Sequence, residues 1–144
     1  MNDNVFLDTN ILVYLYSKTE SEKREACLSI FKQYSCTTST QVLNEFCNVF
    51  IKKYGIPINR IKEFIASILK ICRIKFINES TVYFALDLNN QYGYSYYDCL
   101  ILASALESDC EVLFSEDMSD RQIIEGRLKI TNPFKSQTNE QQLE

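Results

Sequence analysis

The sequence predicts an α/β domain in which a parallel sheet of about five strands lies between two layers of helices. Short apolar runs alternate along the chain with longer stretches whose apolar residues recur at helical spacing. Strands that alternate with helices form parallel sheets covered on both faces, because each helix carries the chain back to the starting edge of the sheet. The length of 144 residues, 46% of them hydrophobic, suits one such three-layer domain.

The strands are expected where short apolar runs meet turn-forming residues. They are residues 5–7, 35–38, 73–77, 111–114 and 128–131. The first run leads directly into Asp8-Thr9-Asn10, which favours a turn and the start of a helix. The chain therefore opens with a strand, a turn and a helix, and Asp8 stands at the end of that strand.

Six helices are expected between these strands. The first begins near residue 11 and the second covers residues 20–33, while Ser39 or Thr40 caps the third. Asn59 is predicted to cap the fourth helix, and Ser80 or Thr81 is predicted to open the fifth, which ends near Gly93. Residues 99–106 are too long an apolar run for an ordinary strand and are rich in Leu and Ala, so they predict a central buried helix.

Composition predicts one soluble cytoplasmic domain over residues 1–134, followed by a disordered polar tail, 135–144. No segment approaches the roughly 20 apolar residues of a membrane span, and the first residues lack the basic start of a secretory signal. The six cysteines are scattered among apolar neighbours, and the chain has no histidine. This spacing indicates buried free thiols and argues against a zinc site.

The formal net charge of −4 is unusual for a protein that binds nucleic acid. Basic residues are nevertheless concentrated between positions 52 and 75, where Glu63 is the one acid. They are Lys52, Lys53, Arg60, Lys62, Lys70, Arg73 and Lys75. This segment is either a solvated helical face or a surface that contacts RNA.

Four acids could gather at one edge of the predicted sheet, although each of them also has a structural explanation, which for Glu45 is a partner from elsewhere in the fold. Asp8 could cap the first helix, Asp98 could belong to a capping box with Ser95, and Asp117 could be a turn residue. Glu45 flanks the apolar stripe of its helix without a basic residue one turn away. If the four carboxylates meet, their mutual repulsion raises their pKa values or requires cations. Mg²⁺ or Mn²⁺ fits such oxygen ligands and supports phosphodiester cleavage.

Four segments of the sequence resemble, in order, the motifs of the PIN-domain family, and in particular of VapC-type toxins of toxin-antitoxin pairs. The segments are residues 5–14 (VFLDTNILVY), 41–46 (QVLNEF), 95–105 (SYYDCLILASA) and 113–118 (LFSEDM). Asp8, Glu45, Asp98 and Asp117 stand at the acidic positions of these motifs, and Thr9, Asn10 and Ser115 match polar positions that line such sites.

The resemblance implies a strand order of 3-2-1-4-5 and a Mg²⁺- or Mn²⁺-dependent endoribonuclease that dimerises and is inhibited by a cognate antitoxin. The sequence departs from the family pattern after Met118, where Ser119-Asp120-Arg121 replaces a segment that usually contains His and Gly. Glu116 or Asp120 is therefore an alternative to Asp117 as the fourth acid. The alternative function is a catalytically silent PIN-like module that binds RNA or protein.

Overall fold

Residues 3–135, which the computed structural model describes, form one sheet in the strand order β3-β2-β1-β4-β6-β5. Neighbouring strands pair in parallel from β3 through to β6, and β5 runs antiparallel against β6. The strands are β1 (Asn4–Leu7), β2 (Ser35–Ser39), β3 (Cys72–Lys75), β4 (Val112–Phe114), β5 (Ile123–Ile124) and β6 (Leu128–Thr131). The strand β1 is the central strand of the parallel part, with β2 and β4 beside it, and Asp8 directly follows this strand.

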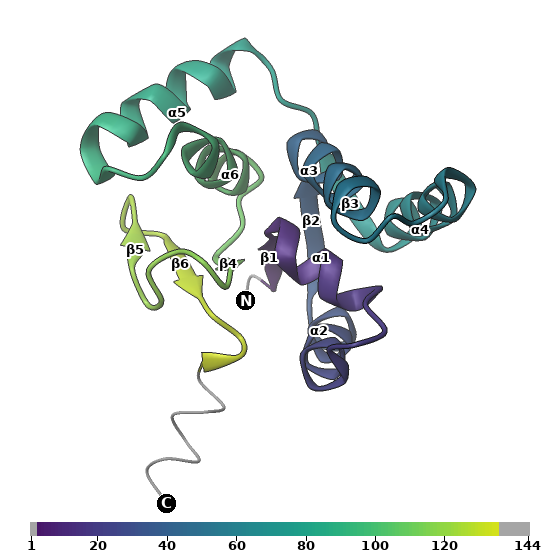
Figure 1. Cartoon of the computed structure of the whole chain (residues 1–144). Helices are drawn as coiled ribbons and strands as arrows, with labels where there is room; N and C mark the ends of the chain where they lie inside the picture. The colour runs from purple at the N-terminus through teal and green to yellow at the C-terminus, as the bar shows by residue number, and fades with distance from the viewer. Residues whose placement is uncertain (1–2, 136–144) are drawn as a thin grey trace, which may run out of the picture.

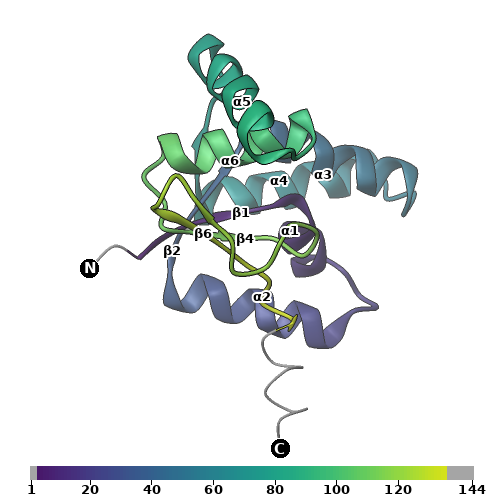
Figure 2. The same ribbon diagram turned by 90° about the vertical axis from the view of Figure 1, so that its left-hand side faces the viewer.

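Helices cover both faces of this sheet. They are α1 (Thr9–Leu15), α2 (Ser21–Gln33), α3 (Thr40–Lys52), α4 (Ile58–Ile71), α5 (Glu79–Tyr92) and α6 (Tyr96–Glu107). Figures 1 and 2 show α2 on one side of the strands and α3, α5 and α6 on the other. The predicted three-layer α/β fold is confirmed.

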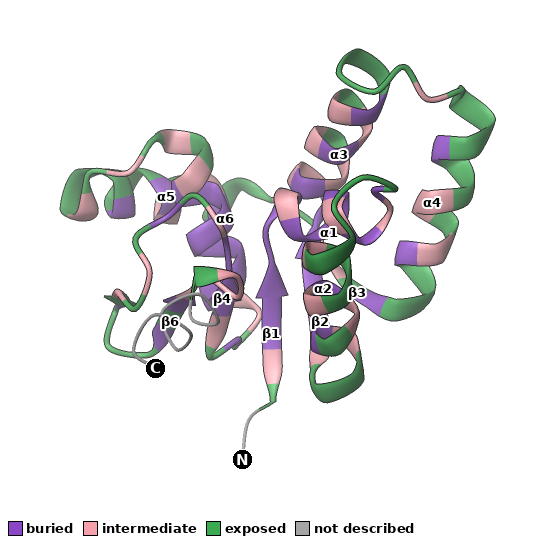
Figure 3. Ribbon diagram, turned by 60° about the horizontal axis from the view of Figure 1, so that its bottom comes forward, coloured by how far each residue is buried: buried purple, intermediate pink, exposed green. Residues whose placement is uncertain are grey.

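The hydrophobic core lies around β1 and α6. Phe6 and Leu7 are fully buried, and Figure 3 shows most of β1 in the buried class. Residues 99–106 of α6 are all buried, as expected of the central helix. Burial of these apolar side chains is the main favourable contribution to folding, so the strand and helix that carry Asp8 and Asp98 are held rigidly.

The parallel part of the sheet has the predicted order, with β6 in the place of the expected fifth strand. The short strand β5 was not predicted, because its two residues are too few to give an alternating pattern. Residues 136–144 of the expected tail lie outside the described part of the chain.

Two predicted helix starts are wrong. Asn59 lies inside α4, which begins at Ile58 directly after Pro57, and no side chain caps this helix. Asn78 rather than Ser80 or Thr81 caps α5, and its side-chain oxygen accepts from the Thr81 backbone N–H at 3.2 Å. Thr81 completes the capping box, since its hydroxyl accepts from the Asn78 backbone N–H.

The six cysteines are free, as predicted, and all except the half-buried Cys47 are buried. Burial raises the pKa of the thiols of Cys27, Cys36 and Cys72 to about 12, so these groups stay protonated. Within residues 3–135 no helix is long and apolar enough to cross a membrane.

Removing the side-chain cap of α5 should destabilise the fold. We expect Asn78→Ala to lower the free energy of unfolding by about 1 kcal/mol, because the backbone N–H of Thr81 loses its acceptor. Asn90→Ala, the same change later in α5, should alter stability by less than about 0.5 kcal/mol. Urea denaturation of both variants measures the difference, and equal effects would contradict the assignment of Asn78 as the cap.

Candidate active site

Asp8 is fixed at the carboxyl end of β1 by hydrogen bonds to both of its carboxylate oxygens. Its backbone N–H donates to the Phe114 carbonyl of β4 at 3.1 Å. One side-chain oxygen accepts from the Thr9 N–H at 2.7 Å and caps α1, and the other accepts from the Ser115 hydroxyl at 2.8 Å. The residue is 8% exposed. Asp8 is thus both the predicted helix cap and a carboxylate at the edge of the sheet.

Glu45 and Asp98 come from two helices that pack on the same face of the sheet. Glu45 lies in the middle of α3, where the Thr9 hydroxyl donates to one of its carboxylate oxygens at 2.5 Å. Asp98 lies in the first turn of α6, and its backbone N–H donates to the capping Ser95 hydroxyl at 3.2 Å. As for Asp8, the capping arrangement and the position at the site are compatible.

Asp117 follows β4 in an irregular segment and is exposed. The Asn10 side-chain amide donates to its carboxylate at 2.7 Å. Its acidic neighbours face other groups: Glu116 accepts from Lys23 at 2.7 Å, and Asp120 accepts from the Asn132 backbone N–H at 2.8 Å. Of these three acids, Asp117 is the one that lines the same cleft as Asp8.

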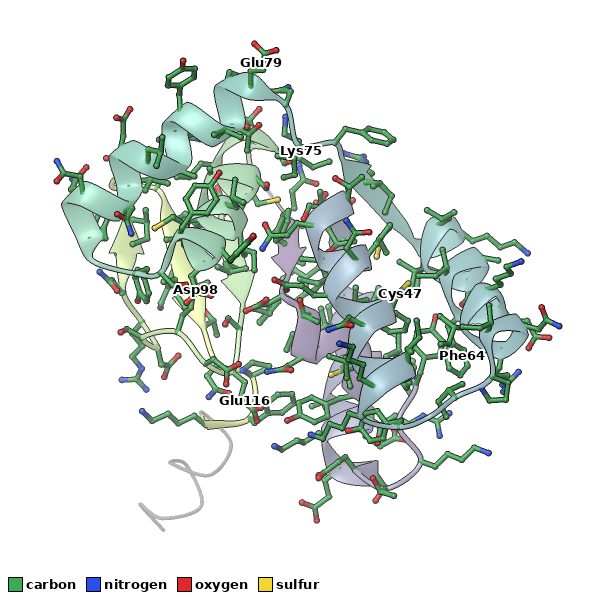
Figure 4. All side chains as sticks on the ribbon, turned by 45° about the horizontal axis from the view of Figure 1, so that its top comes forward. Cys47, Phe64, Lys75, Glu79, Asp98 and Glu116 are labelled. Carbon is green, nitrogen blue, oxygen red and sulfur yellow. The ribbon has the colours of Figure 1, made fainter. Side chains whose placement is uncertain are left out.

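The four predicted acids meet around one cleft of about 310 Å³. Its lining is Asp8, Thr9, Asn10, Glu45, Asn48, Val49, Asp98, Ile101 and Asp117. In Figure 4, Asp98 lies at the start of α6 and Glu116 lies nearer the C-terminal segment. The position at the carboxyl ends of β1 and β4, where the crossovers diverge to opposite sides, is where open parallel sheets bind ligands.

The cleft is electrostatically unfavourable for its own carboxylates. Burial raises the pKa of Asp8 from 3.8 to about 6, although hydrogen bonds from Ser115 and Thr9 oppose the rise. Burial also raises the pKa of Asp98, and the charges of Glu45 and Asp117 add to the increase. These carboxylates lie close enough to repel one another.

No basic side chain relieves this repulsion within residues 3–135. None of the ion pairs formed there includes Asp8, Glu45, Asp98 or Asp117, and no Lys or Arg lines the cleft. Neutral side chains bind three of the acids instead: Ser115 donates to Asp8, Thr9 to Glu45 and Asn10 to Asp117. A set of carboxylates held by neutral donors has the chemistry of a Mg²⁺ or Mn²⁺ site.

In the part of the chain that is described, no group of three or more acidic or cysteine side chains is arranged so that it could hold a metal ion by itself. Mg²⁺ does not need one, because it commonly binds through one or two protein carboxylates and keeps several water ligands. The donor set of the cleft therefore fits a hydrated divalent cation.

Two polar residues of the site were not singled out from the sequence. The Gln41 side-chain amide donates to Glu45 at 3.1 Å and to the Tyr97 carbonyl at 3.1 Å, so it joins α3 to the first turn of α6. Its own side-chain oxygen is buried and has no hydrogen-bond partner among the described residues. Asn48 lines the cleft one turn after Glu45. Their spacing of four and three residues from Glu45 was the available signal, since such positions share a helix face.

The model of the PIN domain matches residues 5–122, which is most of the sequence. The chain belongs to the PIN domain family. No curated protein matches this PIN domain. The family match runs from Val5 in β1 to Gln122, directly before β5, and includes all four acids of the cleft.

Solved structures with the same fold include toxins of toxin-antitoxin systems. A toxin-antitoxin complex from Klebsiella pneumoniae has a TM-score of 0.68 at 23% identity, over 90% of this chain and 98% of that one. VapC20 of Mycobacterium tuberculosis, a toxin that cleaves the sarcin-ricin loop, has a TM-score of 0.67 at 18% identity, over 85% and 98%. VapBC2 from Rickettsia felis, bound to a promoter DNA fragment, has a TM-score of 0.62 at 18% identity, over 90% and 99%. The PIN domain described here therefore has a VapC-like fold.

Replacing the buried acid should stabilise the metal-free protein. The folded protein keeps the proton of Asp8 up to about pH 6, whereas the unfolded chain loses it near pH 4. The stability of the parent therefore falls as the pH rises between these values, and the loss at pH 7 is up to about 3 kcal/mol. Asp8→Asn should recover part of this loss. Urea denaturation from pH 4 to 7 in EDTA measures the free energy of unfolding of both proteins. If it depends on pH in the variant as it does in the parent, Asp8 is not the cause of the pH dependence.

Proposed function

We propose that this PIN domain is a metal-dependent endoribonuclease that acts as the toxin of a toxin-antitoxin pair. The proposal depends on one observation, which is the convergence of four carboxylates on a cleft where, within residues 3–135, neutral donors and no Lys or Arg bind the acids. Membership of the PIN family and the VapC-like fold support the same function.

Asp8, Glu45, Asp98 and Asp117 would hold one or two Mg²⁺ or Mn²⁺ ions. When bound there, such a cation would supply Lewis-acid chemistry, lowering the pKa of a water and neutralising charge on a phosphate. The residues of the chain prepare this site: Ser115 fixes one oxygen of Asp8, Thr9 fixes Glu45, and Asn10 fixes Asp117. Because these donors are neutral, they orient the carboxylates and leave their charge available to a cation.

RNA, a cognate antitoxin and a second copy of the chain are the partners in this proposal. The similar structure from Klebsiella pneumoniae is a toxin-antitoxin complex, and VapC20 is a toxin that cleaves the sarcin-ricin loop. An antitoxin would be needed because an unrestrained ribonuclease damages the cell that makes it.

The proposal predicts that Mn²⁺ both stabilises the protein and activates RNA cleavage. Binding to the folded state alone must raise the melting temperature, by an amount equivalent to about 2.7 kcal/mol at a hundred times the dissociation constant. Asp98→Asn should remove most of this increase, together with cleavage of a fluorescent single-stranded RNA. Thermal melting and gel analysis of the products measure the two effects.

Matched variants separate the enzyme from a contaminant and from a silent module. A contaminating nuclease would cleave equally well in the Asp8→Asn and Asp98→Asn preparations. A catalytically silent module could bind RNA but would show neither stabilisation by Mn²⁺ nor cleavage, and that result would refute the proposed function.

One face of α3 could lead RNA away from the cleft. Glu45, Asn48 and Lys52 follow one another at spacings of three and four residues, so they share this face. Lys52 and Lys53 are exposed at the end of α3. Other basic residues of the segment are partly engaged, because Arg60 pairs with Glu63 and Lys75 pairs with Glu107. The end of α3 is thus the best-placed part of the basic segment to bind RNA phosphates.

Charge reversal at this end should weaken the salt dependence of RNA binding. If both lysines contact phosphates, Lys52→Glu with Lys53→Glu should reduce the slope of log affinity against log salt by about 1.4. Arg24→Glu with Lys32→Glu, on the opposite side of the sheet in α2, is the charge-matched control. Filter binding in EDTA measures the slopes, and equal changes in both double variants would contradict RNA binding by the end of α3.

A further inference from the structure

Glu116, the acid next to Asp117, belongs to a cluster of side chains that lies outside the cleft. The cluster joins Lys23 of α2, Tyr14 of α1, Glu116 and Phe134, and we call it the Lys23 clamp. Lys23 donates to one carboxylate oxygen of Glu116 at 2.7 Å, and the Tyr14 hydroxyl donates to the other at 2.5 Å. Lys23 also donates to the Tyr14 hydroxyl at 3.2 Å. Both oxygens of Glu116 are therefore held on the side away from the cleft.

Aromatic rings fix the cation of the clamp. The Lys23 ammonium lies 4.6 Å from the centre of the Tyr14 ring and 5.3 Å from that of Phe134. The two rings meet edge to face, with centres 5.3 Å apart. The side chains of Lys23 and Glu116 are 33% and 22% exposed, so water screens this pair less than an ordinary surface pair. Such a contact orders its groups more firmly than an isolated surface ion pair does.

The C-terminal segment holds the backbone of the same loop. The Asn132 side-chain amide donates to the Glu116 carbonyl at 3.4 Å, and the Asn132 backbone N–H donates to Asp120 at 2.8 Å. The Asn132 side-chain oxygen accepts from the Phe134 N–H at 2.9 Å, which connects these contacts to the ring of the clamp. Residues on both sides of Asp117 are thus tied to the segment that follows β6.

Asp117 depends on these contacts more than the other three acids do. Asp8 ends a central strand, and Glu45 and Asp98 lie on helices packed against the sheet. Asp117 is exposed in an irregular segment, where the hydrogen bond from Asn10 acts on its carboxylate but does not fix its backbone. The rigidity of the loop must therefore come from its neighbours.

We propose that the Lys23 clamp is a positioning device that holds the loop so that the Asp117 carboxylate faces the cleft in the geometry needed to bind a divalent cation. Lys23 and Tyr14 are not among the residues that line the cleft, and they act through Glu116. This inference depends on the proposed function, since it assigns residues to the same metal site. A merely structural clamp would affect melting of the protein but leave its affinity for cations unchanged.

The test compares the Mn²⁺ concentration at half-maximal stabilisation with the stability of the metal-free protein. In Lys23→Met we expect this concentration to rise about ten-fold, in the range that supporting residues of metal sites usually contribute. RNA cleavage should fall at low Mn²⁺ and return to within about three-fold of the parent at saturating Mn²⁺. Lys23→Arg, which keeps the charge and the donors, should restore most of the affinity.

Two further variants make the result specific. Tyr14→Phe keeps the ring against Phe134 and removes only the hydroxyl, so it should raise the half-saturating Mn²⁺ concentration by a smaller factor, and it remains informative if Lys23→Met does not fold. Arg60→Met breaks the exposed Arg60–Glu63 ion pair on α4, which shares no residue with the clamp, and should leave the affinity unchanged.

The failure of the inference can be told from the failure of the proposed function. If the parent binds Mn²⁺ and cleaves RNA while folded Lys23→Met and Tyr14→Phe need the same Mn²⁺ concentration as the parent, the positioning role is overturned and the nuclease stands. If the parent itself neither binds Mn²⁺ nor cleaves RNA, the proposed function is refuted, and the positioning role is refuted with it.

Discussion

The repulsion among four carboxylates in a cleft that no Lys or Arg of residues 3–135 lines is the constraint on which the rest of the site depends. Burial is the main cause of the raised pKa values of Asp8 and Asp98, and the charges of the neighbouring carboxylates add to the rise. The hydrogen bonds from Ser115, Thr9 and Asn10 orient the acids without cancelling their charge. A lysine in the place of any of these donors would relieve the repulsion and also remove the reason for a cation to bind.

The parallel sheet accounts for the convergence of residues that are far apart in the sequence. The strands β1 and β4 pair in register, so the residues that follow Leu7 and Phe114 lie side by side at one edge. The helices α3 and α6 pack on the same face and add Glu45 and Asp98, and Gln41 bridges them. The energy that holds the acids close together comes from the buried apolar residues of β1 and α6, far more than from polar contacts at the site.

Helix caps and cleft-lining acids coincide at the same places in this PIN domain. Asp8 caps α1 and also faces the cleft, and the Ser95 cap of α6 contacts the backbone of Asp98. A helix start offers free N–H groups and a favourable dipole, so it is an inexpensive place to hold a carboxylate near other negative charges. The folded protein nevertheless carries a destabilising buried charge at Asp8, as is common where a site is built for binding.

The sequence by itself determined the alternation of strands and helices, the buried α6 helix and the four acids that stand at strand ends or on apolar helix faces. Those features depend on local periodicity and on neighbouring residues, which are visible in one dimension. The tertiary structure decided which acid of residues 116–120 faces the cleft, because Glu116 binds Lys23 and Asp120 binds the backbone of Asn132. It also decided the cap at Asn78 and the added strand β5. In irregular segments, side-chain direction follows partners far away in the chain, and only the assembled fold supplies them.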